Sequence, residues 1–127
     1  MRLLILGGTV FLGRALTDAA LERGHEITHF NRGRSREPDP RVETLRGDRS
    51  SLVALKAARA DRRWDAIIDT SGYLPQVVRR ATQVFRAATE RYLFVSSILA
   101  YGTHGLDEAS PVQAAPAPLP DTMTPAT

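Results

Sequence analysis

The chain has 127 residues, of which 43% are hydrophobic and 24% are charged. This balance is typical of a globular protein and excludes a disordered tail or a fibre, while the length is that of one domain. The absence of cysteine excludes disulfides, thiolate zinc sites and cysteine nucleophiles. No apolar stretch approaches the roughly 20 residues of a membrane helix, and no signal peptide is recognisable at the N-terminus, so we expect a cytoplasmic protein.

Arginine carries almost all of the positive charge. Sixteen of the 17 basic residues are Arg, and Lys56 is the single Lys. The net charge is +3, but all of the basic residues and only 11 of the 14 acidic residues lie before residue 105. Because a guanidinium is a two-pronged donor to phosphate and a catalytic ammonium is a compact, tunable group, the composition suits anion contacts better than lysine catalysis.

The first two expected elements are a buried strand and an amphipathic helix. Residues 2–6 are a nearly continuous apolar run that ends at two glycines, as in a strand buried on both faces of a parallel sheet. Between Val10 and Arg23, apolar and small residues recur at three- and four-residue spacing, and Gly24 supplies a stop. The predicted inward face of this helix consists of Phe11, Leu12, Ala15, Leu16, Ala19 and Ala20.

Strands and helices continue to alternate up to residue 95. A second strand over 25–30 leads into a polar loop that ends at Pro40, and a weaker third strand covers 41–45. A fourth and a fifth strand are expected over 65–70 and 92–95. This alternation predicts an α/β fold with a parallel sheet and right-handed crossovers.

Two further helices connect the later strands. Ser50 or Ser51 caps the first, which turns Leu52 and Leu55 inward and ends near Asp61. Pro75 suits the first turn of the second helix. The predicted apolar stripe of this helix consists of Val77, Val78, Ala81, Val84, Phe85 and Ala88.

The end of the chain differs in composition. Residues 111–127 contain five of the eight prolines and show neither the helical nor the strand period. We therefore expect a folded unit over 1–104 and a proline-rich, extended segment over 105–127.

The strongest motif is Gly7-Gly8-Thr9-Val10-Phe11-Leu12-Gly13, between the first predicted strand and the first predicted helix. In that position, free backbone N–H groups and the helix dipole attract a pyrophosphate. Gly7 would allow the tight turn, and Gly13 would let the helix pack closely on the sheet. The context favours dinucleotide binding over a purely structural turn.

Polar residues after the later strands extend this candidate site. Asn31-Arg32 ends the second strand, where an acid holds the ribose hydroxyls of NAD and a base accommodates the 2′-phosphate of NADP. The sequence therefore favours NADP over NAD. We interpret Arg34 and Arg36 as solvent-facing loop residues. Asp69 ends the fourth strand, and we expect it to border the nucleotide.

Five segments, in order, resemble the NAD-dependent epimerase/dehydratase family, the extended short-chain dehydrogenase/reductases: GGTVFLG, NRGR, Gly47-Asp48, DTSGY and VSSILAYG. The resemblance covers residues 1–102 and implies a Rossmann-type doubly wound sheet of about five strands that holds NADP or NAD. The cofactor-binding residues it implies are Gly7, Gly8, Thr9, Phe11, Leu12, Gly13, Asn31, Arg32, Asp48, Arg49, Thr70, Ser71 and Gly72.

Two positions qualify this resemblance. Val10 replaces the family's middle glycine. A β-branched residue adopts a positive φ with difficulty, and its side chain fills space where the backbone would approach phosphate, which puts cofactor affinity in doubt. Asp48 resembles the aspartate that hydrogen-bonds the adenine amine in the family. Capping of the helix that follows Arg49 is an alternative role for Asp48.

The catalytic residues of the family are incomplete in this chain. In the family, a Ser or Thr after the fifth strand polarises the substrate, and a Tyr-x-x-x-Lys pair one helix later supplies the acid and base. Ser97 matches the serine, although a strand-end serine can also simply bond the backbone. None of the tyrosines, Tyr73, Tyr92 and Tyr101, has a lysine four residues on.

We therefore expect the NAD(P)-binding part of an epimerase, dehydratase or reductase, truncated before its catalytic pair and its substrate region. Such a chain binds a dinucleotide but catalyses no hydride transfer, and a small-molecule substrate belongs only to a full-length form. Whether the chain acts as an enzyme stays open.

Two alternative functions stay open. The GGT-x-F turn also resembles that of chloroplast stem-loop RNA-binding relatives of the same family, and the basic charge of residues 1–104 suits RNA. A non-catalytic NADP(H) sensor would bind tightly and change its oligomeric state.

We further expect self-association through the sheet edge beyond the fifth strand. His25 and His29 share a strand face without a third ligand, so we expect no metal site.

Overall fold

A computed structural model describes residues 1–101 and 107–114 of the chain. Every predicted helix and strand is present, with ends within three residues of those expected. In chain order the elements are β1 (Arg2–Leu6), α1 (Phe11–Glu22), β2 (Glu26–Asn31), β3 (Glu43–Arg46), α2 (Leu52–Arg59), β4 (Ala66–Asp69), α3 (Pro75–Phe85), β5 (Tyr92–Phe94) and the 3-10 turn η1 (Ile98–Tyr101).

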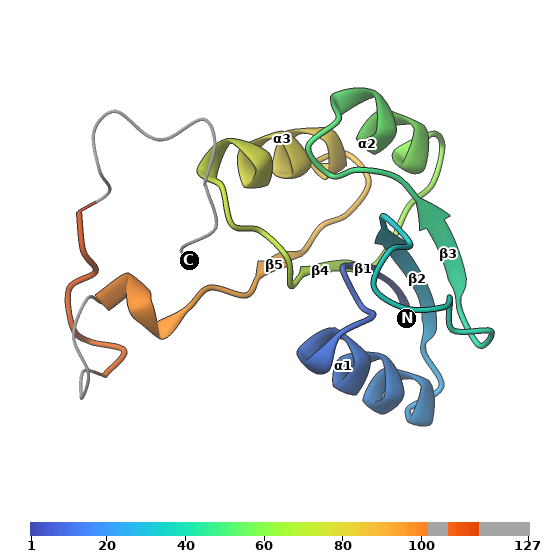
Figure 1. Cartoon of the computed structure of the whole chain (residues 1–127), viewed down its shortest axis with the longest axis horizontal. Helices are drawn as coiled ribbons and strands as arrows, with labels where there is room; N and C mark the ends of the chain where they lie inside the picture. The colour runs from blue at the N-terminus through green and yellow to red at the C-terminus, as the bar shows by residue number, and fades with distance from the viewer. Residues whose placement is uncertain (102–106, 115–127) are drawn as a thin grey trace.

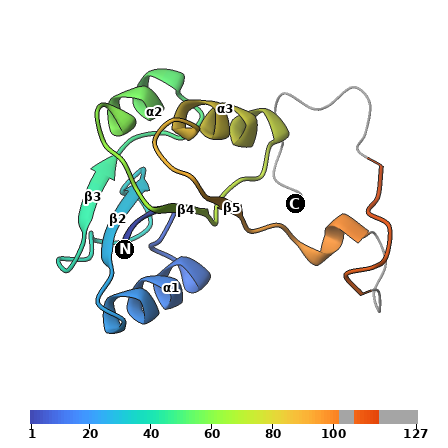
Figure 2. The same ribbon diagram turned by 180° about the vertical axis from the view of Figure 1, so that it is seen from behind.

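The five strands form one parallel sheet in the order β3-β2-β1-β4-β5. Helices α2 and α3 cover one face and α1 covers the other (Figure 1), and the view from behind shows the same two layers (Figure 2). The predicted α/β class and doubly wound sheet are therefore confirmed. Since all strands point the same way, the carboxyl ends of β1, β2 and β4 lie side by side at one edge of the sheet.

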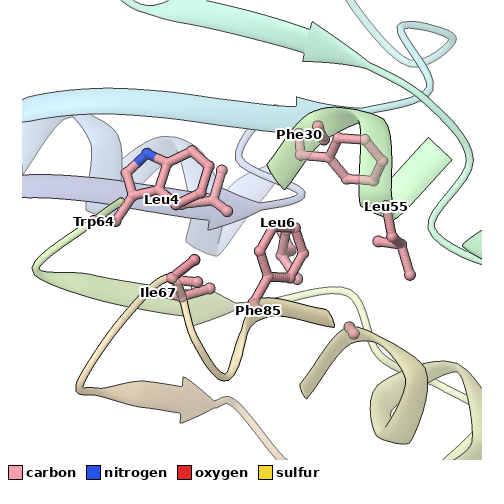
Figure 3. Close-up of a cluster of buried hydrophobic side chains, with 10 residues drawn as sticks. Leu4, Leu6, Phe30, Leu55, Trp64, Ile67 and Phe85 are labelled. Carbon is pink, nitrogen blue, oxygen red and sulfur yellow. The ribbon is translucent and has the colours of Figure 1, made fainter. Parts of the chain in front are cut away.

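Strand β1 is apolar on both faces because it separates two hydrophobic clusters. Leu4 and Leu6 are fully buried under α2 and α3, in one cluster with Ile67, Trp64 and Phe85, the last residue of α3 (Figure 3). The rings of Trp64 and Phe85 meet edge to face, with centroids 6.0 Å apart. On the other face, α1 packs against a cluster that consists of Leu3, Ile5 and Ile27.

The inward face of α1 differs from the prediction. Phe11 is 90% exposed and Leu12 is 41% exposed, whereas Gly13 and Thr17 are buried. The reason is the glycine turn. The first turn of α1 rests through Gly13 on the backbone of Gly8, so the face of the helix that carries Gly13 turns inward. Hydrophobic periodicity gives no weight to a glycine and therefore misplaces the face by part of a turn.

The other two helices agree better with expectation. Ser51 is the cap of α2, and its Oγ accepts a hydrogen bond from the N–H of Ala54 at 3.2 Å. Leu55 is fully buried as expected, but Leu52 is 43% exposed because it stands in the first turn at the end of the helical layer. All six residues of the predicted α3 stripe are buried or half-buried.

Residues 107–114 contain no helix or strand. The N–H of Gln113 donates to the carbonyl of Ala100 at 2.7 Å, which ties this stretch to η1. Gly102, at the end of the VSSILAYG segment, and most of the predicted proline-rich segment lie outside the described residues. Within the part that the structure describes, no helix is long and apolar enough to cross a membrane.

Candidate functional site

A cleft of about 500 Å³ lies at the carboxyl end of the sheet, between the glycine turn and the loops after β2, β3 and β4. Parallel sheets bind their ligands at this edge, where the strand order reverses. Nine of the 13 predicted cofactor-binding residues line the cleft: Gly7, Gly8, Thr9, Asn31, Arg32, Asp48, Arg49, Thr70 and Ser71.

The glycine turn is possible only with glycine at its key positions. Gly7 and Gly8 have φ values of 110° and 85°, in the left-handed region that favours glycine. A Cβ at Gly13 would lie 2.5 Å from the Cα of Gly8. The first turn of α1 therefore rests directly on the backbone of the glycine turn, whereas the sequence predicted a close approach of Gly13 to the sheet.

Val10 does not carry the strain that the sequence suggested. Its φ is −124° and its ψ is 144°, an ordinary extended conformation for a β-branched residue. The positive φ falls instead on Phe11, at 30°. Phe11 is 90% exposed. Val10 lines the cleft, so its side chain occupies space beside the turn, as the sequence suggested.

The N-terminus of α1 faces the cleft without a protein anion. Its cap residue, Val10, makes no side-chain hydrogen bond to the helix, and the first turn contains no acid. The first N–H groups and the positive end of the helix dipole are therefore suited to an external anion. Phe11, Leu12 and Gly13 do not line the cleft, but they build this first turn.

Asn31 ties the loop after β2 to the glycine turn. Its Nδ2 donates to the carbonyl of Gly7 at 3.4 Å, and its Oδ1 accepts from the N–H of Gly33 at 2.9 Å. These two hydrogen bonds fix the start of the loop, in which Arg32 lines the cleft. Arg34, interpreted from the sequence as solvent-facing, is exposed but also lines the cleft.

Asp48 is a cleft residue and not a helix cap, because Ser51 caps α2. Its Oδ1 accepts hydrogen bonds from the N–H of Ser50 at 2.8 Å and from the Ser50 hydroxyl at 2.6 Å. These bonds lower the pKa of Asp48, and the nearby charges of Arg32 and Arg34 lower it further. Asp48 therefore presents a stable carboxylate to the cleft.

A buried charge cluster stands behind the cleft. Arg49 donates to both carboxylate oxygens of Asp69, at 2.5 and 2.7 Å, and to the hydroxyl of Ser71 at 2.9 Å. Tyr92 donates its hydroxyl to Asp69 at 2.8 Å. Asp69 is fully buried and does not line the cleft, so the expectation that it borders the nucleotide is wrong. The next two residues, Thr70 and Ser71, line the cleft instead.

Burial and Asp69 govern the ionisation of both partners. Burial raises the pKa of Tyr92, and the charge of Asp69 raises it further, so the phenol stays protonated and donates. Burial lowers the pKa of Arg49, but the hydrogen bonds and charge of Asp69 outweigh this and give a net rise. The cluster joins the loop after β3 to β4 and β5. Sequence reasoning missed the role of Tyr92, because no local signal links residues 23 positions apart.

Besides Phe11, Leu12 and Gly13, two more predicted site residues, Gly72 and Ser97, lie outside the cleft lining. A side chain at Gly72 would collide with Val78 and Phe94, so this glycine serves packing. Ser97 is exposed after β5, and its carbonyl accepts from the N–H of Ala100 at 3.0 Å. Conversely, Tyr73, Leu74 and Val77 line the cleft just before and at the start of α3, although the sequence did not predict them as site residues. Their position after the DTSG segment is the signal that was available.

The model of the NAD dependent epimerase/dehydratase family matches residues 3–122 of the chain. The chain belongs to this family. Two solved structures share the fold. UDP-glucose 4-epimerase from Bifidobacterium longum, in complex with NAD+ and UDP, is 16% identical with a TM-score of 0.77, over 91% of this chain and 43% of that one. The enzyme WbmG from Bordetella bronchiseptica, in complex with NAD, is 21% identical with a TM-score of 0.75, over 89% and 44%.

A curated relative in sequence is the chloroplast stem-loop binding protein of 41 kDa b from Arabidopsis thaliana. It is 27% identical over an alignment of 114 residues, and the match covers 79% of this chain and 30% of that protein. This epimerase/dehydratase-family chain therefore spans less than half the length of each of these relatives. Among residues 1–101 and 107–114 no group of three or more His, Cys, Asp or Glu is placed to hold a metal.

Proposed function

We propose that this chain is the dinucleotide-binding part of an NAD(P)-dependent epimerase, dehydratase or reductase, with the cofactor in the cleft. The observation that carries the proposal is the glycine turn. Its two left-handed glycines and the Gly8–Gly13 contact present an uncapped helix N-terminus to a cleft at the reversal point of the sheet. A turn that only had to connect a strand to a helix would require neither the open cleft nor the missing cap.

Each wall of the cleft suits one part of a dinucleotide. The first N–H groups of α1 would hold the pyrophosphate. Asn31 and Arg32 would hold the adenosine ribose, and Asp48 would accept from the adenine amine, while Thr70 and Ser71 line the remaining wall. The bound nicotinamide would supply hydride transfer. Arg32, where an acid would select NAD, supports a preference for NADP.

The proposal is tested by titrating NADPH and NADH into the folded chain while following nucleotide fluorescence. We expect saturable binding of both. NADPH should bind about tenfold tighter, because one charge-assisted hydrogen bond is worth about 1.5 kcal/mol. No saturable binding at millimolar nucleotide would contradict dinucleotide binding, and tighter binding of NADH would contradict only the NADP preference. Sizing with and without nucleotide would reveal the ligand-dependent assembly that a sensor requires.

We assign Ser97 the role of polarising the substrate in a form that also contains the catalytic pair. Its exposed position after β5 leaves it accessible to a substrate. Because no Tyr-x-x-x-Lys pair occurs in these 127 residues, the isolated chain should bind cofactor without turning it over. Measurable oxidation of NAD(P)H with a carbonyl or sugar-nucleotide substrate would contradict the expectation that the isolated chain does not turn the cofactor over.

RNA binding is a second candidate, favoured by the curated relative and by the charge of one helical layer. Residues 52–64 and 75–86, which contain α2 and α3, hold seven basic residues and a single acid. We expect a stem-loop RNA to bind in a filter assay with an affinity that falls steeply as salt rises, because phosphate contacts release counterions. Absence of RNA retention at low salt would exclude this candidate.

A further inference from the structure

The buried ring of His29 packs against the glycine turn. His29 stands in β2 and is only 1% exposed. A Cβ added to Gly8 would lie 2.7 Å from both Cδ2 and Nε2 of this ring, so the imidazole is in direct contact with the backbone of the turn. Neither His29 nor Thr17, the helix residue beside it, lines the cleft, and the function proposed above gives them no role.

Thr17 joins this ring to the first turn of α1. Its hydroxyl donates to the carbonyl of Gly13 at 2.7 Å, so it accepts from Nε2–H of His29 at 2.8 Å. Gly13 in turn lies against the backbone of Gly8. The four residues therefore form a closed circuit, in which the turn, the imidazole, the hydroxyl and the helix each contact the next.

The surroundings of His29 hold it neutral, with its proton on Nε2. Burial lowers the pKa of the imidazole, and the charge of Asp39, which opposes this, is shared with Arg41 at 2.7 Å. Nδ1 is buried and has no hydrogen-bond partner among the described residues. Within that part of the chain, the bond to Thr17 is therefore the one hydrogen bond that fixes the orientation of the ring.

This orientation matters because the ring and the turn cannot move independently. Without the Thr17 hydroxyl, the Nε2–H of His29 would be buried without an acceptor, which is costly. The ring would have to turn or shift toward another acceptor, and its edge lies against Gly8. Displacement of Gly8 moves the backbone on which Gly13 rests, and with it the N–H groups at the start of α1.

We propose that His29 and Thr17 are positioning residues of the dinucleotide site: they hold Gly8 against the first turn of α1 and so keep its free N–H groups aimed at the pyrophosphate. They act through the turn, because neither residue lines the cleft. A binding site needs such support, since its donors have to stay within about 0.5 Å of the productive geometry. The inference rests on the proposed function for the identity of the ligand, whereas the bracing of the turn depends on no ligand.

Thr17→Val tests the proposal, because it removes the hydroxyl and keeps a β-branched side chain of similar shape and helix propensity. In a fluorescence titration of the full chain, we expect NADPH to bind at least about tenfold more weakly, the effect of losing one charge-assisted hydrogen bond to phosphate. Circular dichroism at the titration temperature verifies that the variant is folded. A folded T17V protein that binds NADPH within about threefold of the wild type would overturn the proposal.

Thr28→Val is the matched control. Thr28 precedes His29 in β2, is 3% exposed, and its hydroxyl accepts from Nε1–H of Trp64 at 3.3 Å. The substitution therefore removes a hydroxyl that accepts from a buried ring N–H, as T17V does, but on the opposite face of the sheet from α1. We expect a comparable fall in the urea midpoint and an unchanged NADPH affinity. If T28V weakens NADPH binding as much as T17V, affinity follows overall stability and the positioning role is excluded.

Thr17→Ser is the rescue variant. It retains the hydroxyl and deletes a buried methyl group, so it should lower the urea midpoint and leave NADPH affinity within about threefold of the wild type. A loss of affinity in T17S as large as that in T17V would show that packing around the side chain, and not the hydrogen bond, controls the site. That result would overturn the assignment.

Two measurements without nucleotide separate this inference from the proposed function. Nitrogen NMR of the wild-type imidazole should show His29 neutral, with its proton on Nε2, and a proton on Nδ1 instead would contradict the circuit. The amide signals of Gly8 and Gly13 should shift in T17V and not in T28V. If both results hold and the wild type binds no nucleotide, the proposed function fails while the bracing of the turn stands. If the amide signals of T17V match those of the wild type, the bracing itself is excluded.

Discussion

Replacing Gly13 with alanine is expected to abolish saturable NADPH binding and to lower the free energy of unfolding by about 1–3 kcal/mol. The added Cβ would lie 2.5 Å from the Cα of Gly8 and 2.6 Å from its N atom. These are backbone atoms of a tight turn, so α1 has to move away and its N–H groups leave the cleft. Alanine has a higher helix propensity than glycine by about 1 kcal/mol, so a net loss would show that the collision dominates.

Gly24→Ala is the matched control for this substitution. Gly24 follows α1 with a φ of 76°, but a Cβ there would meet no atom within 4 Å. The Gly24→Ala substitution should lower the free energy of unfolding by about 1–2 kcal/mol through backbone strain, and it should leave nucleotide affinity unchanged. Urea unfolding and NADPH titration measure the two effects. If G13A binds NADPH within threefold of the wild type, the close helix–turn contact is not what positions the cofactor.

Asp69→Asn is expected to lower the free energy of unfolding by about 3–5 kcal/mol. The substitution removes the carboxylate that accepts two hydrogen bonds from the Arg49 guanidinium and one from the Tyr92 hydroxyl. The Arg49 side chain is only 15% exposed, so its charge would stay buried without a counter-ion. Urea unfolding monitored by circular dichroism measures the loss, which is large against the roughly 5–15 kcal/mol of a typical domain.

Two further variants distinguish the loss of the buried Arg49–Asp69 ion pair from the general effect of removing a charge. Arg62→Gln breaks the ion pair with Glu43, whose side chains are 35% and 47% exposed, and should cost less than about 1 kcal/mol. The double variant R49Q/D69N removes both buried charges and should be more stable than D69N alone. Equal losses for D69N and R62Q would show that the Arg49–Asp69 pair contributes no more than a surface pair.

The sequence predicts the sheet well because each strand leaves a local record of its surroundings. The apolar run of residues 2–6 requires cover on both faces, which only a central strand of a layered parallel sheet receives. The glycine turn is equally legible, because its meaning depends on the strand before it and the helix after it. Both inferences use neighbours along the chain.

The errors share a different origin. Phe11 and Leu12 have the spacing of an inward face, yet Gly13 occupies that face because the turn brings the helix onto the backbone of Gly8. Val10 was expected to bear a positive φ, which the folded turn passes to Phe11. In each case the sequence shows which residue types are present. It does not show which residue of the turn adopts a positive φ or which one contacts the neighbouring backbone.

By itself, the sequence determined the α/β class, the elements and the position of the glycine turn, because these depend on burial periods and on neighbours within a few residues. Only the tertiary structure decided that Asp69 is a buried anchor for Arg49 and Tyr92, 20 and 23 residues away. It also placed the His29 ring against Gly8 and within hydrogen-bond distance of Thr17. Charge pairing and cavities arise where separate segments meet in space, and no periodicity along the chain records such a meeting.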